Sequence, residues 1–498
     1  MGSTITARRA FIVLAILVAL PLLIRLYYAF QNEGFTGSDA YFSLREARSI
    51  LETGLPAYHD PYSYGGKEQV FMPLFYYLLA FIGLFMPLAI AGKILPNILS
   101  ASIAVISYLI AYQLTKNRIA ALFSAGISGL IPAFISSTTN TLSPLSLFIP
   151  LLFLIVYCFI RIHESNFIYW FLTALLASML TTPLTAILIP CFFFYSMLLR
   201  LEDVIHDRAE IETMIFSLFF IMWALFLVFK DAFAMHGAGI MWNGTVAIAL
   251  TLPLTLPLML YLTGLLPAAY GIYSIFDHIF KRKDRRSYPI MALALSAVLL
   301  AWLRIIEVTA ALAVAGISFA IIFSLFYNEL YSYIEKTNFA RLKTPLMVIL
   351  GLVCVLSLAI PSWMIARESS NAALSDQEYT ALSWIRENTE KDSVILATVE
   401  EGNAISAVAE RKNVADDNAL LQADVAQRAE DISRIFSTQF KTESLRLLTR
   451  YNVTHVMITS KAKEQFGSGL AQSFNDEECF KERYKKDIRI YEVKCRFA

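Results

Sequence analysis

The feature that most constrains this chain is a succession of long apolar runs that continues to about Trp363. The runs are roughly 16 to 24 residues long, and a helix of that length crosses the hydrocarbon core of a membrane. Of all residues, 57% are apolar and 16% are charged, against about 25% charged in soluble domains. The sequence therefore predicts a multi-span membrane protein, and with a net charge of +1 it excludes a nucleic-acid-binding or disordered chain.

The C-terminal part has a different composition. After residue 365 the sequence is charged and polar and shows helix and strand periodicity. Ser375 and Glu378 form a capping-box sequence before a helix, and residues 394–399, 455–459 and 480–493 read as strands. We expect a transmembrane domain over residues 1–365 and a soluble α/β domain over residues 366–498.

Lysine and arginine are concentrated in short loops between the apolar runs, and such loops remain cytoplasmic. This rule places the N-terminus in the cytoplasm, with loop 31–92 and the C-terminal domain on the outer face. We expect about 11 to 13 transmembrane helices. The apolar stretches 72–91 and 245–256 fit better as segments at the outer surface than as spans. The expected spans are 10–30, 93–114, 118–136, 144–162, 166–181, 182–200, 211–232, 256–280, 287–304, 307–327 and 343–363.

Asp39 stands in the first outer loop, two residues after Gly37. A carboxylate near the membrane edge is costly unless it binds a cation or takes a proton from a reacting hydroxyl. The alternative is that Asp39 caps the helix that runs to Leu51, because Asp is common at N-caps. Arg45 and Arg48 follow at helical spacing, and they could pair with Asp39 or hold a lipid phosphate.

The order of several motifs resembles the catalytic subunit of oligosaccharyltransferase, a membrane glycosyltransferase of the GT-C class. The string G-x-D-x-x-x-x-x-R-x-A-R from Gly37, then H-D-P from His59 and M-P-L-F-Y-Y from Met72, is similar to the first outer loop of that family. Arg304 is similar to its phosphate-contacting arginine, and residues 374–388 are similar to the start of its outer domain. The resemblance implies a GT-C fold and a sugar donor on polyprenyl (dolichyl) phosphate. It also implies that Asp39 is catalytic and that four residues surround the lipid phosphate: Arg45, Arg48, His59 and Arg304.

Three departures from the family bear on the chemistry. Residues 398–402 read T-V-E-E-G where the family has W-W-D-Y-G to grip the acceptor sequon, so only Gly402 is kept. The second outer loop, 136–144, lacks the D-x-D that completes the family's metal site. Loop 231–253 lacks the family's sequon-contacting glutamate. The candidate residues on the acceptor side are Glu400, Glu401, His236 and Trp242.

One acid with neighbouring hydroxyls is a poor cage for Mg²⁺ or Mn²⁺, so a divalent metal is disfavoured; if one bound, Asp39 would hold it. The absence of the family's other acids favours transfer of the sugar to a hydroxyl group. An amide nitrogen is a weak nucleophile that needs paired acids and a metal, whereas a hydroxyl needs only one general base. We expect transfer of a sugar to a glycan or other hydroxyl acceptor on the outer face of the bilayer, with Asp39 as base. The alternatives are an oligosaccharyltransferase with a degenerate sequon motif, acting on protein asparagine, and a non-catalytic glycolipid-binding subunit.

Several candidate residues also have simpler explanations. Arg304 and Glu307 are three residues apart at the end of a span, so they could form an intrahelical ion pair. His59 could be a loop residue without chemistry. Cys479 and Cys495 flank the predicted final hairpin and could bridge it, whereas the scatter of the five cysteines excludes a disulfide framework.

Overall fold

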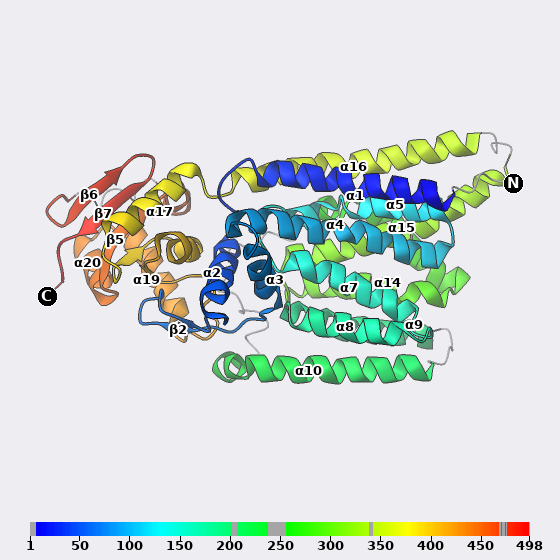
Figure 1. The fold of residues 1–498 in the computed structure, drawn as a ribbon, viewed down its shortest axis with the longest axis horizontal. Helices are drawn as coiled ribbons and strands as arrows, with labels where there is room; N and C mark the ends of the chain where they lie inside the picture. The colour runs from blue at the N-terminus through cyan, green and yellow to red at the C-terminus, as the bar shows by residue number, and fades with distance from the viewer. Residues whose placement is uncertain are drawn as a thin grey trace.

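The molecule consists of a bundle of long helices at one end and an α/β region at the other, with the two termini at opposite ends (Figure 1). This computed structural model describes residues 6–201, 207–237, 255–337, 342–467, 470, 474 and 476–497. Helices α2 and α3 lie between the two parts.

The helices of the bundle begin and end close to the predicted apolar runs. Among the described residues, six helices are long and apolar enough to cross a membrane, and the number of candidate spans rises to eight if each bent helix pair is one span. The expected number of 11 to 13 is not confirmed, partly because α7 and α8 are shorter than a full crossing requires. The helices and their turns are α1 (Ala7–Ala29), α4 (Leu88–Thr115), α5 (Arg118–Ser128), α6 (Pro132–Thr138), α7 (Leu145–Ile160), α8 (Phe167–Met179), η1 (Pro183–Ile187), α9 (Leu188–Arg200), α10 (Arg208–His236), α12 (Leu256–Thr263), α13 (Leu265–Asp277), η3 (His278–Arg282), η4 (Arg285–Ser287), α14 (Tyr288–Trp302), α15 (Val308–Glu335) and α16 (Lys343–Asn371).

The expected span over residues 256–280 is broken into two helices. The chain bends by 94° between α12 and α13, at Gly264, whose φ of +86° lies in the left-handed region that favours glycine. A second bend, of 51°, separates α5 from α6, which begins at Pro132. Proline has no N–H to continue the helical hydrogen bonds, so a new helix starts there. The stretch 245–254 lies outside the described residues.

The segment between α1 and α4 crosses the end of the bundle. It contains α2 (Ser38–Thr53), the short antiparallel strands β1 (His59–Asp60) and β2 (Lys67–Glu68), and α3 (Leu74–Gly83). Its apolar side chains share one hydrophobic core with the α/β region, in which Tyr41 and Phe75 pack with Ile385 and Ile405. The segment is therefore held by both parts of the molecule.

The α/β region is built on a five-stranded mixed sheet in the order β4-β3-β5-β7-β6. The central strands β3 and β5 are parallel, and β5, β7 and β6 are antiparallel neighbours. The predicted capping box forms at Ser375 and Glu378. Cys479 and Cys495, the pair singled out in the sequence, are joined in a disulfide beside β6 and β7. The elements are α17 (Asp376–Asn388), β3 (Val394–Leu396), η6 (Val399–Glu401), α18 (Gly402–Ala404), η7 (Ile405–Ala409), β4 (Lys412–Asn413), α19 (Val425–Ser437), α20 (Lys441–Arg450), β5 (Val453–Ile458), α21 (Ser460–Phe466), β6 (Phe480–Lys485) and β7 (Arg489–Val493).

Candidate active site

Asp39 lies in the first turn of α2, and α2 lies between the helical bundle and the α/β region (Figure 1). The N-cap of α2 is Gly37, and no side chain caps the helix, so the alternative that Asp39 is the cap is wrong. The Asp39 side chain is accessible to solvent. The protein packed around the carboxyl group desolvates it, and this desolvation raises its pKa.

Two further carboxyl groups interact electrostatically with Asp39, and both come from other elements. Asp417 belongs to the α/β region, and burial raises its pKa to about 7, opposed by a hydrogen bond from Ser38 and reinforced by the charge of Asp39. Glu307 is the N-cap residue of α15 and bonds to the Thr309 hydroxyl. Although the Glu307 side chain is exposed, desolvation by the protein packed around its carboxyl group raises its pKa, and the charge of Asp39 adds to the shift. Three acids from different elements are therefore close enough to influence one another's charge near the first turn of α2.

The segment that carries Asp417 is attached directly to α2. Asn403 Nδ2 donates to Ser38 Oγ at 2.9 Å and to Asn418 Oδ1 at 2.7 Å. Gly402 lies so close to this segment that a Cβ on it would be 2.7 Å from Asp416 Cβ and would clash with the Ala415 carbonyl oxygen. A side chain at Gly402 would therefore not fit between the two stretches of chain unless one of them moved.

Arg45 lies in a buried charge network, with 8% of its side chain exposed. Its Nη1 is 3.0 Å from Asp60 Oδ2, and the same carboxylate lies 3.7 Å from Lys67 Nζ. Lys67 also pairs with Asp416. The network thus joins α2, the loop after it and the α/β region. This placement favours a structural role for Arg45 over the expected phosphate contact.

Arg48 also faces the α/β region. Its Nη1 is 3.2 Å from both Glu410 Oε1 and the Ala407 carbonyl oxygen. The Glu410 pair is exposed, so Arg48 contributes little to stability through it. Arg48 thus contacts the α/β region directly, whereas Arg45 is linked to it only through Asp60, Lys67 and Asp416.

Arg304 and Glu307 lie in the short connection between α14 and α15. Arg304 adopts a left-handed backbone conformation with φ of +53°, so the two residues do not share a helix. The alternative of an intrahelical ion pair is therefore wrong. The Arg304 side chain is exposed, and among the described residues it has no ion-pair partner. It is thus a free cation close to Glu307, at the same end of the bundle as Asp39.

The expected acceptor-side residues have different surroundings. Glu400 is exposed and close enough to Asp417 to raise its pKa. Glu401 is buried and completes a capping box with Thr398, whose hydroxyl donates to it at 2.7 Å. His236 ends α10, with Nε2 at 2.8 Å from the Leu420 carbonyl oxygen. Trp242 lies outside the described residues.

His59 is at the surface, where its Nδ1 is 2.9 Å from Glu68 Oε1. Within the described chain, no hydrogen bond or ion pair joins His59 to Asp39 or Arg304. The structure therefore groups Asp39, Glu400 and Arg304 at one end of the bundle and leaves His59 apart from the acids. Sequence reasoning missed Asp417 and Glu307 as members of the site, and the only available signal was the adjacent pair Asp416-Asp417 after Gly402.

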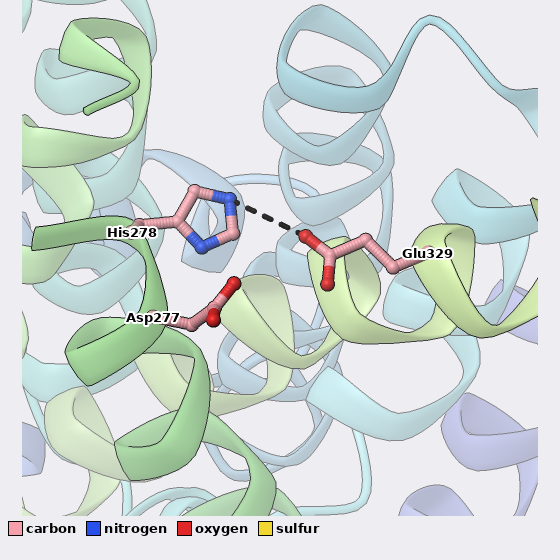
Figure 2. Close-up of side chains that lie close together, drawn as sticks. All are labelled: Asp277, His278 and Glu329. Carbon is pink, nitrogen blue, oxygen red and sulfur yellow. Dashed lines mark ion pairs between the residues drawn. The ribbon is translucent and has the colours of Figure 1, made fainter. Parts of the chain in front are cut away.

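A second cluster of ligand-type side chains lies at the other end of α15. Asp277, His278 and Glu329 point toward one another (Figure 2), with His278 Nε2 at 3.7 Å from Glu329 Oε1. Their atoms could hold a metal ion. However, Arg282 lies 2.7 Å from Asp277 and 2.9 Å from Glu329, and it neutralises both carboxylates. At a rise of 1.5 Å per residue, Glu329 is ~33 Å further along α15 than Glu307, so this cluster is separate from Asp39.

The solved structures to which this chain is similar in fold include three glycosyltransferases of the GT-C class. The oligosaccharyltransferase of Archaeoglobus fulgidus in the apo form has a TM-score of 0.70 at 15% identity, over 95% of this chain and 73% of that one. ArnT from Cupriavidus metallidurans, bound to undecaprenyl phosphate, gives 0.58 at 10% identity, over 96% and 97%. The arabinofuranosyltransferase AftD from Mycobacteria gives 0.58 at 11% identity, over 100% of this chain and 40% of that one.

No protein-family model matches the sequence, and no curated protein matches it. The likeness is thus one of fold, and it extends over almost the whole chain. It agrees with the family resemblance that the motifs of the first loop carry. The chain is therefore a membrane protein with the oligosaccharyltransferase-like fold of the GT-C glycosyltransferases.

Proposed function

We propose that this protein transfers a sugar from a polyprenyl-phosphate donor to a hydroxyl group of a glycan or similar acceptor, with Asp39 as general base. The observation that carries the proposal is the accessible but desolvated carboxyl group of Asp39, at the junction of the helical bundle and the α/β region. Desolvation makes an ionised carboxylate a stronger base. On this proposal the junction faces the outer side of the membrane.

The fold neighbours support a lipid-linked donor. ArnT was solved with undecaprenyl phosphate, and the archaeal oligosaccharyltransferase was solved with an inhibitory peptide and dolichol-phosphate. In this chain Arg304 is the candidate for the lipid phosphate, because it is exposed and has no carboxylate partner among the described residues. A guanidinium group forms short, strong hydrogen bonds with phosphate oxygens.

The transfer step follows from these two groups. Asp39 takes the proton from the acceptor hydroxyl while the hydroxyl oxygen bonds to the sugar C1. The bond from C1 to the phosphate oxygen breaks, and its electron pair stays on the polyprenyl phosphate. Arg304 stabilises the negative charge that develops there. No other reactant is needed for the atoms and charges to balance.

A metal ion is implied by one relative, since the archaeal oligosaccharyltransferase was also solved with Zn and sulfate. The residues around Asp39 do not fit a metal cage in the described part of this chain. Among all the described residues, only Asp277, His278 and Glu329 place three ligand atoms within 4.8 Å of one another, and this cluster is far from Asp39. The loop 136–144 also carries no carboxylate. The proposed sugar transfer therefore does not involve a metal ion.

The test is turnover of purified Asp39→Asn protein supplied with polyprenyl-phosphate-linked sugars and glycan acceptors. We expect a loss of at least ~100-fold in kcat with donor binding retained, because the amide keeps the shape of the side chain but cannot take a proton. Wild-type activity should fall as the pH drops through the raised pKa of Asp39, since only the ionised form is a base. Undiminished turnover of the variant would remove Asp39 from the mechanism.

The same assay separates the alternatives. Transfer to a peptide asparagine but not to glycans would favour an oligosaccharyltransferase. Binding of the donor without turnover on any acceptor would favour a non-catalytic subunit. A matched control is Asp392→Asn, since Asp392 is an exposed carboxylate that pairs with Lys412 at the surface.

A further inference from the structure

We propose that a cavity at the start of α3 binds a neutral sugar unit of the glycan acceptor and holds it while a hydroxyl of the next unit reaches Asp39. The inference rests on the proposed function and names the part of the chain that would recognise the acceptor. The cavity has a volume of about 520 Å³. Sites for small organic ligands are typically about 300–1,000 Å³, so one sugar ring fits.

The walls of the cavity come from segments that are far apart in the sequence. Residues 68–73 of the first loop meet the end of α8, one side of α10 and the α/β region. The Leu74 N–H donates to the Leu180 carbonyl oxygen at 2.9 Å, which fixes the start of α3 on the end of α8. His236 Nε2, at 2.8 Å from the Leu420 carbonyl oxygen, fixes the end of α10 on the α/β region. These bonds keep the cavity formed without a ligand.

One wall of the cavity is an aromatic pair. The rings of Tyr58 and Phe71 are stacked, with centroids 5.1 Å apart and planes 20° apart. Tyr58 is 45% exposed, so its ring keeps surface for a ligand. The C–H face of a sugar ring packs on such a surface, because the C–H hydrogens are partly positive and an aromatic face is negative.

The charges of the cavity exclude a phosphate. Its two charged side chains are the carboxylates Glu68 and Asp231, and among the described residues no lysine or arginine lines it. Glu68 pairs with His59 at the surface, whereas Asp231 has no ion pair or hydrogen bond within the described chain. Carboxylates accept hydrogen bonds from hydroxyl groups and repel a phosphate. The occupant therefore carries hydroxyls, and it is not the phosphate of the donor.

Gln69 distinguishes a sugar from a lipid tail. It also lines the cavity, and only 6% of it is exposed. Its amide nitrogen and amide oxygen have no hydrogen-bond partner within the described chain. A buried amide without partners costs free energy. A sugar supplies both a donor and an acceptor through its hydroxyl or acetamido groups, whereas a hydrocarbon chain supplies neither.

The cavity is close to the helix of the candidate base. Phe71 packs edge-to-face on Phe42 of α2, with ring centroids 5.2 Å apart. Phe42 follows Asp39 by three residues, so the two are neighbours on adjacent turns of α2. A glycan with one unit in the cavity can thus extend its next unit toward Asp39.

The binding test uses the purified full-length protein in lipid nanodiscs and three neutral probes: maltotriose, mannotriose and chitotriose. At least one should bind the wild type. Tyr58→Leu and Asp231→Ala should each weaken its binding ~10-fold, because each removes a stacking or hydrogen-bonding group. Tyr379→Leu and Asp392→Asn, exposed in the α/β region, are the matched controls and should bind as the wild type does. Binding of none of the three, or equal losses in cavity and control variants, would overturn the proposal.

Gln69→Leu gives a second readout. It should weaken trisaccharide binding ~10-fold, since the amide no longer meets the sugar. The thermal stability of the ligand-free protein should not fall, because leucine removes an unpaired buried amide. Lower stability with unchanged binding would show that the amide serves the fold alone, and would overturn its role in the cavity.

Kinetics separate this inference from the proposed function. The cavity variants should raise the KM for the glycan acceptor ~10-fold and leave the KM for the donor unchanged. A higher donor KM instead, or displacement of the trisaccharide by undecaprenyl phosphate, would assign the cavity to the donor and overturn the inference. Turnover with an unchanged acceptor KM in all variants would overturn it while the proposed function stands. Trisaccharide binding that behaves as expected, without turnover on any donor, would leave the sugar site standing and remove the proposed function.

Discussion

Asn403 Nδ2 donates a hydrogen bond of 2.9 Å to Ser38 Oγ, and this contact joins the α/β region to the turn that carries Asp39. The two residues are 365 positions apart in the chain. The α/β region therefore contacts the residue next to the candidate base, Asp39, and is not an independent domain. Changes in either part should therefore alter the geometry of the other.

Replacing Arg304 should weaken donor binding. Arg304→Gln removes an exposed guanidinium without a carboxylate partner in the described chain, so we expect little change in thermal stability. The KM for the polyprenyl-phosphate donor should rise ~10- to 100-fold, because hydrogen bonds to charged groups contribute about 1.5–3 kcal/mol. Steady-state kinetics measure this, with Arg208→Gln, an exposed arginine of α10, as the control. Equal KM values for both variants would contradict the role of Arg304.

Removing divalent metal should leave transfer intact. We expect turnover in EDTA to equal turnover in untreated protein, because the described residues around Asp39 do not provide a metal cage. The measurement is the rate of sugar transfer after chelation and after adding back Mg²⁺ or Mn²⁺. Activity that is abolished by EDTA and restored by Mn²⁺ would show that the acids form a metal site.

Enlarging Gly402 should separate α2 from the segment that carries Asp417. A Cβ in Gly402→Ala would meet the Ala415 carbonyl oxygen and lie 2.7 Å from Asp416 Cβ. We expect a loss of about 1–3 kcal/mol in stability, as for other overpacked sites, and a larger proportional loss of kcat. Denaturation and kinetics measure the two effects. The control is Gly351→Ala in α16, where a Cβ would have no neighbour within 4 Å. An unchanged kcat in Gly402→Ala would argue against this coupling.

Breaking the buried charge network should destabilise the junction. Lys67→Met leaves the carboxylates of Asp416 and Asp60 buried with one cation fewer, which costs about 3–5 kcal/mol in comparable sites. Thermal or chemical unfolding of the detergent-solubilised protein measures this. Arg434→Met, which breaks an exposed pair with Glu430, should cost no more than about 1 kcal/mol. Similar losses for both variants would show that the Lys67 network adds no stability.

Much of the helical part could be predicted because its signals are local. Apolar runs of membrane-crossing length place both ends of α1, α4 and α10 within about five residues of their observed bounds, whereas α15 and α16 start where predicted but continue well beyond the predicted ends. The bend at Gly264 was missed, since an isolated glycine in an apolar run does not distinguish a straight helix from a broken one.

The candidate site was less predictable. Asp39 was identifiable because it is an isolated acid in a loop that resembles a known family. The partner of Arg45 could not be predicted. An arginine at helical spacing from an acid can face either a phosphate or a buried carboxylate, and only the packing of the folded chain places Asp60 against Arg45. Glu401 was expected to face the acceptor, but the capping box with Thr398 turns it inward.

By itself the sequence determined that this chain forms long apolar helices followed by a polar α/β region, and it singled out Asp39. These properties depend on hydrophobic periodicity and run length, which are set by residues close in the chain. Only the tertiary structure decided that Asp417 and Glu307 join Asp39, and that the adjacent Asp416 does not. Such contacts between distant segments depend on how the packed parts close on one another, and the linear order of residues does not encode that closure in any local pattern.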